Sequence, residues 1–83
     1  MNTKLFVAGL DWSIDTNELK EIFSQYGNVV YAKVVTDMNQ RSRGFGFVEM
    51  ASHEEATDCL KNLDQSVQKN RQIVVKWKED RQR

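Results

Sequence analysis

The chain has only one cysteine and one histidine, and it has no excess of charge of either sign. Cys59 by itself can form neither an internal disulfide nor a metal knuckle, because both need pairs or clusters of ligands. His53 has no partner nucleophile or ligand set in the sequence, so we expect it at the surface rather than in a catalytic site. These shortages predict no enzyme activity, no bound metal and no cofactor, and a lone cysteine suits a reducing compartment.

Long apolar segments are also missing. No apolar run exceeds a few residues, and the start Met1-Asn2-Thr3-Lys4 lacks the hydrophobic region of a signal peptide. We therefore expect no membrane association and a cytoplasmic location, with the nucleus or an organelle as alternatives. A chain of 83 residues can form one small domain, and it leaves no room for an appended catalytic unit.

The most informative stretch is Arg43–Met50, in which glycines and aromatic residues alternate. A period of two is that of a β-strand, so alternate residues share a face. One face carries Arg43, Phe45, Phe47 and Glu49, and the other carries Gly44, Gly46, Val48 and Met50. Glycine within a strand is typical of places where another element approaches closely. We therefore expect helices to pack against the glycine face and the phenylalanine face to stay open for binding.

Capping residues mark the start of two helices. Asp15 is followed three positions later by Glu18, and Ser52 forms a capping box with Glu55. Gly27 is expected to end the first helix in a left-handed conformation. Each helix has one apolar stripe: Leu19, Ile22, Phe23 and Tyr26 in the first, and Ala56, Cys59, Leu60 and Leu63 in the second.

The other strand-like stretches are Lys4–Gly9, Val29–Thr36 and Gln72–Lys78. By parity, the second of these points Val30, Ala32 and Val34 inward, and Tyr31, Lys33 and Val35 outward. The order β-α-β-β-α-β predicts an α+β, ferredoxin-like sandwich, in which two helices pack on one face of a four-stranded antiparallel sheet. Right-handed crossovers place the first and third strands at the centre. We expect one domain over residues 1–83, with a core at about 3–78 and a charged, frayed tail at 79–83.

The two tryptophans have different expected positions. Trp12 either covers the edge of the core or contacts a base from the rim of the sheet, and the first placement is favoured because tryptophan is often only partly buried. Trp77 has the inward parity of Ile73 and Val75, so its favoured position covers the core near the end of the last strand. The alternative is that the tail folds it back.

The octamer at 43–50 resembles the first ribonucleoprotein signature of the RNA-recognition motif, K/R-G-F/Y-G/A-F-V-x-F/Y. Only Met50 departs from this pattern, and it falls on the buried side, where methionine is a soft core substitution. Leu5–Leu10 resembles the second signature and brings Phe6 to the same outer face as the two phenylalanines of the octamer. The resemblance covers essentially the whole chain and implies non-catalytic binding of single-stranded RNA in post-transcriptional RNA metabolism.

The resemblance also assigns roles on the outer face. It implies that Phe6 and Phe45 each stack one base, that Phe47 packs against the sugars between them, and that Arg43 holds a phosphate. Further contacts are expected from Tyr31, Lys33, Arg41, Lys76, Lys78 and Trp12. For Arg41, a solvated loop charge is nearly as well supported as a phosphate contact. We expect about three to five bound nucleotides.

The neutral total hides an uneven distribution of charge. The outer face has the cations Lys33, Arg43, Lys76 and Lys78 against Glu49, and the helices have the carboxylates Glu18, Glu21, Glu54, Glu55 and Asp58. Charge near the phosphates matters more for nucleic-acid affinity than the sum does.

Two other functions stay open at this point. The near-zero net charge also suits a protein-binding module of the same fold, which could use the sheet or coexist with RNA binding on the helical face. Single-stranded DNA is the other alternative, although single-stranded RNA is the usual target of this module. We expect a monomer that resembles either small proteins with one such domain, which the Met1 start slightly favours, or one module of a longer protein.

Overall fold

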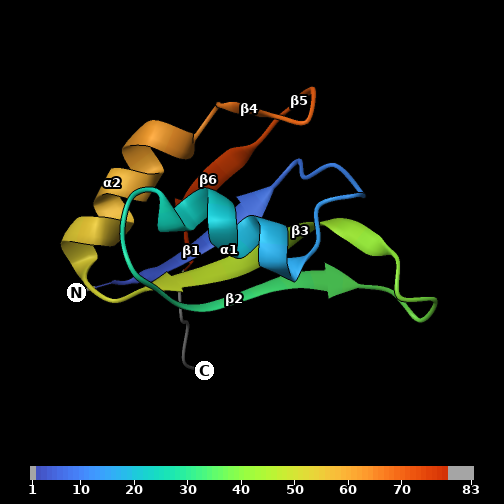
Figure 1. Cartoon of the computed structure of the whole chain (residues 1–83), viewed down its shortest axis with the longest axis horizontal. Helices are drawn as coiled ribbons and strands as arrows, with labels where there is room; N and C mark the ends of the chain where they lie inside the picture. The colour runs from blue at the N-terminus through green and yellow to red at the C-terminus, as the bar shows by residue number, and fades with distance from the viewer. Residues whose placement is uncertain (1, 79–83) are drawn as a thin grey trace.

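The computed structural model describes residues 2–78, and the predicted frayed tail at 79–83 lies outside them. A four-stranded antiparallel sheet carries two helices on one side, as predicted (Figure 1). The strands are β1 (Lys4–Ala8), β2 (Val29–Thr36), β3 (Ser42–Met50) and β6 (Val74–Trp77), and the helices are α1 (Thr16–Ser24) and α2 (His53–Leu63). The order β2-β3-β1-β6 confirms that β1 and β3 are the central pair. No helix in residues 2–78 is long and apolar enough to cross a membrane.

The core fills the space between the helices and the inner face of the sheet. Its buried side chains are Leu5, Val7, Leu10, Ile14, Leu19, Phe23, Val34, Val48, Met50, Ala56, Cys59, Leu63, Ile73 and Val75. The predicted placements of Met50 and Cys59 in the core are confirmed. Burial raises the pKa of the Cys59 thiol to about 11, because a thiolate there would lose its hydration.

Both predicted helix starts are confirmed by side-chain hydrogen bonds. Asp15 Oδ1 accepts from the backbone N–H of Glu18 at 2.8 Å. Ser52 Oγ accepts from the backbone N–H of Glu55 at 3.1 Å and donates to Glu55 Oε1 at 2.9 Å. The second oxygen of Glu55 accepts from the backbone N–H of Asn28 at 2.6 Å, so this carboxylate joins α2 to the loop that precedes β2.

The prediction for Gly27 is wrong, because its backbone does not adopt the left-handed conformation. The helix α1 already ends at Ser24, with Gln25 in the right-handed region at its C-cap. A glycine is nevertheless required at position 27 for another reason. A Cβ atom on Gly27 would lie 2.7 Å from the Cβ of Glu55, so α2 packs where a side chain would stand.

The predicted alternation of inward and outward side chains in β2 is wrong at the start of the strand. Val30 is 63% exposed, and Val29 packs against the core in its place. The cause is a shift of register between Val29 and Tyr31 in the pairing of β2 with β3, since one extra residue exchanges the two faces of a strand. After the shift, Ala32 and Val34 face the core as predicted.

The sequence does not predict the small hairpin between α2 and β6 (Figure 1). Its strands are β4 (Val67–Gln68) and β5 (Arg71–Gln72), so the last sheet strand begins later than expected. Asn70, at the turn of this hairpin, has a left-handed φ of 67°. Lys69 Nζ lies 2.9 Å from Glu18 Oε2, so an ion pair connects the hairpin to α1.

Trp77 packs against the core from the end of β6, as predicted. Its indole stacks on the ring of His53, with centroids 5.1 Å apart and an angle of 10° between the planes. His53 Nδ1 donates to the backbone carbonyl of Asn2 at 2.7 Å. His53 is therefore half-buried between the first residues and the last strand, where the sequence predicted a surface position.

Candidate nucleic-acid interface

The outer face of the sheet is a grid of side chains in three rows that run across the strands. The central row, from β2 to β6, is Lys33, Phe47, Phe6 and Lys76. One flanking row contains Phe45, Ala8 and Val74, and the other contains Tyr31, Glu49, Lys4 and Lys78. Neighbouring strands lie about 4.8 Å apart, and successive rows about 6.5–7 Å apart. The register of the sheet therefore fixes the spacing of every group on this face.

Three phenylalanine rings form one cluster at the centre of the grid. The ring centroids of Phe6 and Phe45 are 5.8 Å apart, those of Phe6 and Phe47 are 5.6 Å apart, and those of Phe45 and Phe47 are 6.3 Å apart. Each ring is only half-buried, because both helices lie on the opposite side of the sheet (Figure 1). The cluster can therefore stack on flat molecules that approach from solvent.

Cations border this cluster. Arg43 Cζ lies 5.8 Å from the centroid of the Phe45 ring, and Lys78 Nζ lies 5.7 Å from the centroid of the Phe47 ring. Both distances are within the range of a cation–π contact. The lysines at the two ends of the central row are exposed. Aromatic surface and positive charge thus occupy the same face, as the sequence predicted.

Trp12 is 79% exposed, so the favoured prediction that it covers the edge of the core is wrong. Leu10 and Ile14 fill that edge and hold the loop after β1 at both ends. Between them, Asp11 Oδ1 accepts from the backbone N–H of Ser13 at 2.9 Å and from its hydroxyl at 2.8 Å. These bonds lower the pKa of Asp11, and they shape a turn that projects Trp12 into solvent.

The loop between β2 and β3 lies next to Trp12. Asp37 Oδ1 accepts from the backbone N–H groups of Asn39 at 2.8 Å and of Arg41 at 3.0 Å, and these bonds fold the loop. An open groove of about 570 Å³ separates the two loops and is lined by Trp12, Ser13, Gln40, Arg41 and Ser42. The structure thus brings the predicted site residues Trp12 and Arg41 together at one end of the sheet.

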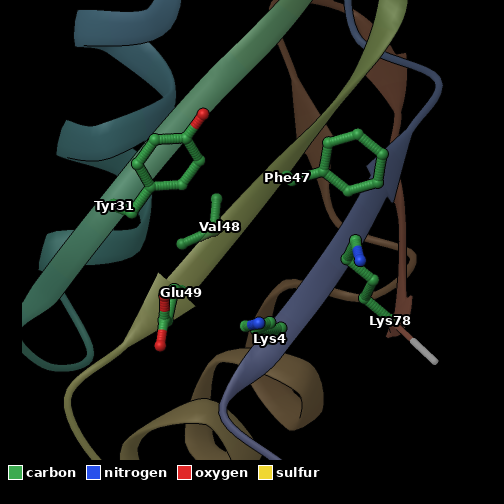
Figure 2. Close-up of a pocket in the computed structure, with 6 residues that line it drawn as sticks. All are labelled: Lys4, Tyr31, Phe47, Val48, Glu49 and Lys78. Atoms are coloured by element: carbon green, nitrogen blue, oxygen red, sulfur yellow. The ribbon is translucent and has the colours of Figure 1, made fainter. Parts of the chain in front are cut away.

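A second groove, of about 420 Å³, lies at the other end of the outer face (Figure 2). It is lined by Lys4, Tyr31, Phe47, Val48, Glu49 and Lys78. The rings of Tyr31 and Phe47 come from neighbouring strands, and Glu49 lies further along β3 (Figure 2). The sequence places Glu49 on this face, but from the sequence alone we assign it no role there. The feature that could have indicated a binding role is that Glu49 is a carboxylate on a face of aromatic rings and cations.

Residues 5–74 match the RNA recognition motif, so the chain belongs to this family. The fold and the half-buried aromatic cluster on the outer face agree with that assignment. The RNA recognition motif is generally a non-catalytic binding module.

Three similar proteins illustrate the relationship. The chain is 46% identical over 81 residues to the chloroplastic 31 kDa ribonucleoprotein of Nicotiana sylvestris, and it covers 26% of that protein. It is 42% identical over 76 residues to the mitochondrial glycine-rich RNA-binding protein 4 of Arabidopsis thaliana, and it covers 56% of that protein. The crystal structure of RNA Binding Protein PG1 superposes with a TM-score of 0.90 at 33% identity, covering 98% of this chain and 99% of that one.

The predicted cytoplasmic location is contradicted by these relatives. Several proteins at 40–46% identity are chloroplastic or mitochondrial by name, which points to an organelle rather than the cytoplasm. The prediction rests on the lack of a signal-peptide region at the start of the chain. That feature bears on secretion and says nothing about import into an organelle.

Proposed function

We propose that the chain binds single-stranded RNA on the outer face of its sheet, without catalysis. The observation that carries the proposal is the cluster of Phe6, Phe45 and Phe47, which the helices leave exposed and which cations border. A single-stranded nucleic acid offers flat bases and regular negative charge, and this face offers flat rings and positive charge. The names of the similar ribonucleoproteins and RNA-binding proteins support RNA as the ligand.

In this proposal Phe6 and Phe45 each stack one base, Phe47 packs against the sugars between them, and Arg43 holds a phosphate. Stacking contributes roughly 1–3 kcal/mol per base, so two stacks supply about 2–6 kcal/mol. Micromolar affinity requires about 8 kcal/mol. The remaining contacts come from Tyr31, Lys33, Lys76, Lys78, Arg41 and Trp12, for a site of about three to five nucleotides.

The unit that binds is a monomeric domain with a core at about 3–78, acting in post-transcriptional RNA metabolism. The chain spans between 26% and 56% of the first relatives it matches, so the proposal concerns this domain and not the whole of those proteins. RNA is preferred over DNA because a 2′-hydroxyl would lie where Phe47 packs against the sugars.

The test compares the native chain with Phe45→Ala in fluorescence-anisotropy titrations of a labelled, unstructured RNA pool. Loss of one stacked base should weaken binding by about 1–3 kcal/mol, which is roughly 5-fold to more than 100-fold. Val67→Ala is the matched control, because Val67 is an exposed apolar residue of the hairpin, away from the grid. It should bind like the native chain.

Circular dichroism melts must first show that both variants are folded. If the native chain binds no RNA even at low salt, the proposal fails. It also fails if Phe45→Ala and Val67→Ala bind equally well, since the RNA would then lie elsewhere. A matched single-stranded DNA pool that binds as tightly as the RNA would contradict the preference for RNA.

A further inference from the structure

Glu49 is the only acidic member of the three rows of described residues that form the outer face. A carboxylate here repels phosphates, so it weakens any binding that depends on the backbone of the nucleic acid alone. When ionised it can only accept hydrogen bonds. A ligand that makes use of Glu49 must therefore bring hydrogen-bond donors to it.

The surroundings of Glu49 suit a nucleobase. Its register partners are Tyr31 on β2 and Lys4 on β1, and Phe47 precedes it by one row. Together these side chains line the groove of about 420 Å³ in Figure 2, a volume within the range of small-molecule sites. A flat ring in this groove has aromatic surface beside it and the carboxylate at its edge.

The carboxylate also has capacity for further hydrogen bonds. Among residues 2–78 its one hydrogen bond comes from Thr3 Oγ1, which lies 3.5 Å from Oε2, at the outer limit for such a bond. A carboxylate offers about four acceptor sites on its two oxygens. Two donors side by side can therefore bind both oxygens at once, as in other bidentate pairs.

We propose that this groove is a nucleotide subsite that selects guanine, with Glu49 as the residue that determines the specificity. The inference rests on the proposed binding of RNA to this face. The guanine base lies against the ring of Tyr31, the register partner of Glu49 on β2, and its N1–H and N2–H groups donate to the two carboxylate oxygens of Glu49.

Guanine is selected because it has two adjacent donors on its Watson–Crick edge. Adenine and cytosine each present one amino group on that edge, so each can donate to only one of the two oxygens. Uracil presents a single N–H between two carbonyl oxygens, which a carboxylate repels. A bidentate contact discriminates against a wrong base by about 1–3 kcal/mol, so guanine is preferred by about tenfold or more.

The test measures the affinity of the native chain for four labelled RNA octamers. One is octauridine, and the other three have a guanosine, an inosine or an adenosine in place of one central uridine. Inosine keeps N1–H and lacks the amino group of guanine, so it removes one of the two proposed bonds. We expect the guanosine octamer to bind about tenfold or more tighter than octauridine, and the inosine octamer to bind in between. In Glu49→Gln the ratio of guanosine to inosine should fall to near one.

Glu54→Gln is the matched control, because it removes one negative charge from the exposed first turn of α2. It should keep the native ratios. Glu49→Gln also removes the repulsion between the carboxylate and the phosphates, which strengthens the binding of every octamer by a common factor. The test therefore uses the ratios of affinities between octamers and not the affinities themselves. Equal binding of all octamers by the native chain, or ratios that survive in Glu49→Gln, would overturn the inference and leave RNA binding intact. No binding of any octamer would reject the proposed function itself.

Discussion

Gly46 shows how one missing side chain permits the sheet to pack. It is buried in β3 at the point where the strand passes under α1. A Cβ atom there would collide with the backbone carbonyl of Lys33 and would lie 3.2 Å from Leu19 Cδ2. The backbone of β2 is fixed by its pairing with β3, so it cannot retreat. Glycine at this position therefore serves the core behind the phenylalanine cluster rather than the RNA.

Gly46→Ala should destabilise the domain. Forcing a methyl group into a packed core costs typically about 1–3 kcal/mol, and we expect the free energy of unfolding to fall by that amount in urea titrations. Thr36→Ala is the control, since Thr36 lies on the neighbouring strand and is exposed. A Gly46→Ala variant as stable as this control would show that β2 can adapt to the extra methyl group.

At the scale of the elements, the carboxylate of Glu55 joins two parts of the chain. It accepts hydrogen bonds from the backbone of Asn28 and from the hydroxyl of Ser52, and these bonds lower its pKa, the bond from Asn28 contributing most. A lowered pKa in the folded state means that the unfolded chain binds the proton more readily. The stability that Glu55 contributes is therefore present above its ordinary pKa of 4.5 and is lost as the pH falls through the lower, folded value.

Glu55→Gln should reduce this acid sensitivity. In thermal melts between about pH 6 and pH 3, we expect the midpoint of the native chain to fall more steeply than that of the variant. Glu54→Gln removes a neighbouring carboxylate that makes neither bond, so it should retain the steeper, native profile. Identical slopes for the native chain and Glu55→Gln would show that other carboxyl groups govern unfolding in acid.

The elements that the sequence predicts well are those with a strong apolar pattern. β1, β3 and both helices follow from periodicity and caps, and these patterns alone place Phe6, Phe45 and Phe47 on one face of the sheet. The sequence does not predict the hairpin of β4 and β5, because its residues are mostly polar and each of its strands has only two residues.

The remaining errors come from contacts that local pattern does not encode. The register shift near Val30 arises where β2 pairs with β3, and parity along one strand cannot reveal it. Trp12 is exposed because Leu10 and Ile14 already fill the edge of the core. Its position therefore depends on the space left in the core, which the hydrophobicity of the residue does not predict. The groove beside Glu49 is formed by the register of three strands. The sequence therefore predicts which of its residues lie on the outer face, but not how they are arranged around the groove.

At the scale of the whole molecule, the net charge is zero, but the positive and negative side chains are concentrated on different sides. The outer face contributes most of the cations near a bound RNA, and the helices contribute carboxylates at a distance. With about three phosphates bound, as proposed for this face, we expect a salt slope of about −2 for a single strand in a plot of log affinity against log salt concentration. Binding should therefore weaken only modestly between low and physiological salt.

Lys76→Gln should make that slope shallower by about 0.7, because one fewer phosphate is neutralised. The measurement is a series of anisotropy titrations from about 50 to 300 mM salt. Lys61→Gln, at an exposed position in the last turn of α2, is the control and should leave the slope unchanged. Equal shifts in both variants would mean that affinity follows the net charge rather than its place on the molecule.

The spacing of the phenylalanine rings has a consequence for the shape of any RNA they hold. Their centroids are 5.6–6.3 Å apart, whereas stacked bases in a helical strand rise by about 3.4 Å. Bases that lie on neighbouring rings are therefore pulled out of register with one another, and a strand already ordered in a duplex cannot engage two rings at once. Binding to this surface would therefore compete directly with base pairing, and the bound strand would stay unpaired and accessible to other molecules.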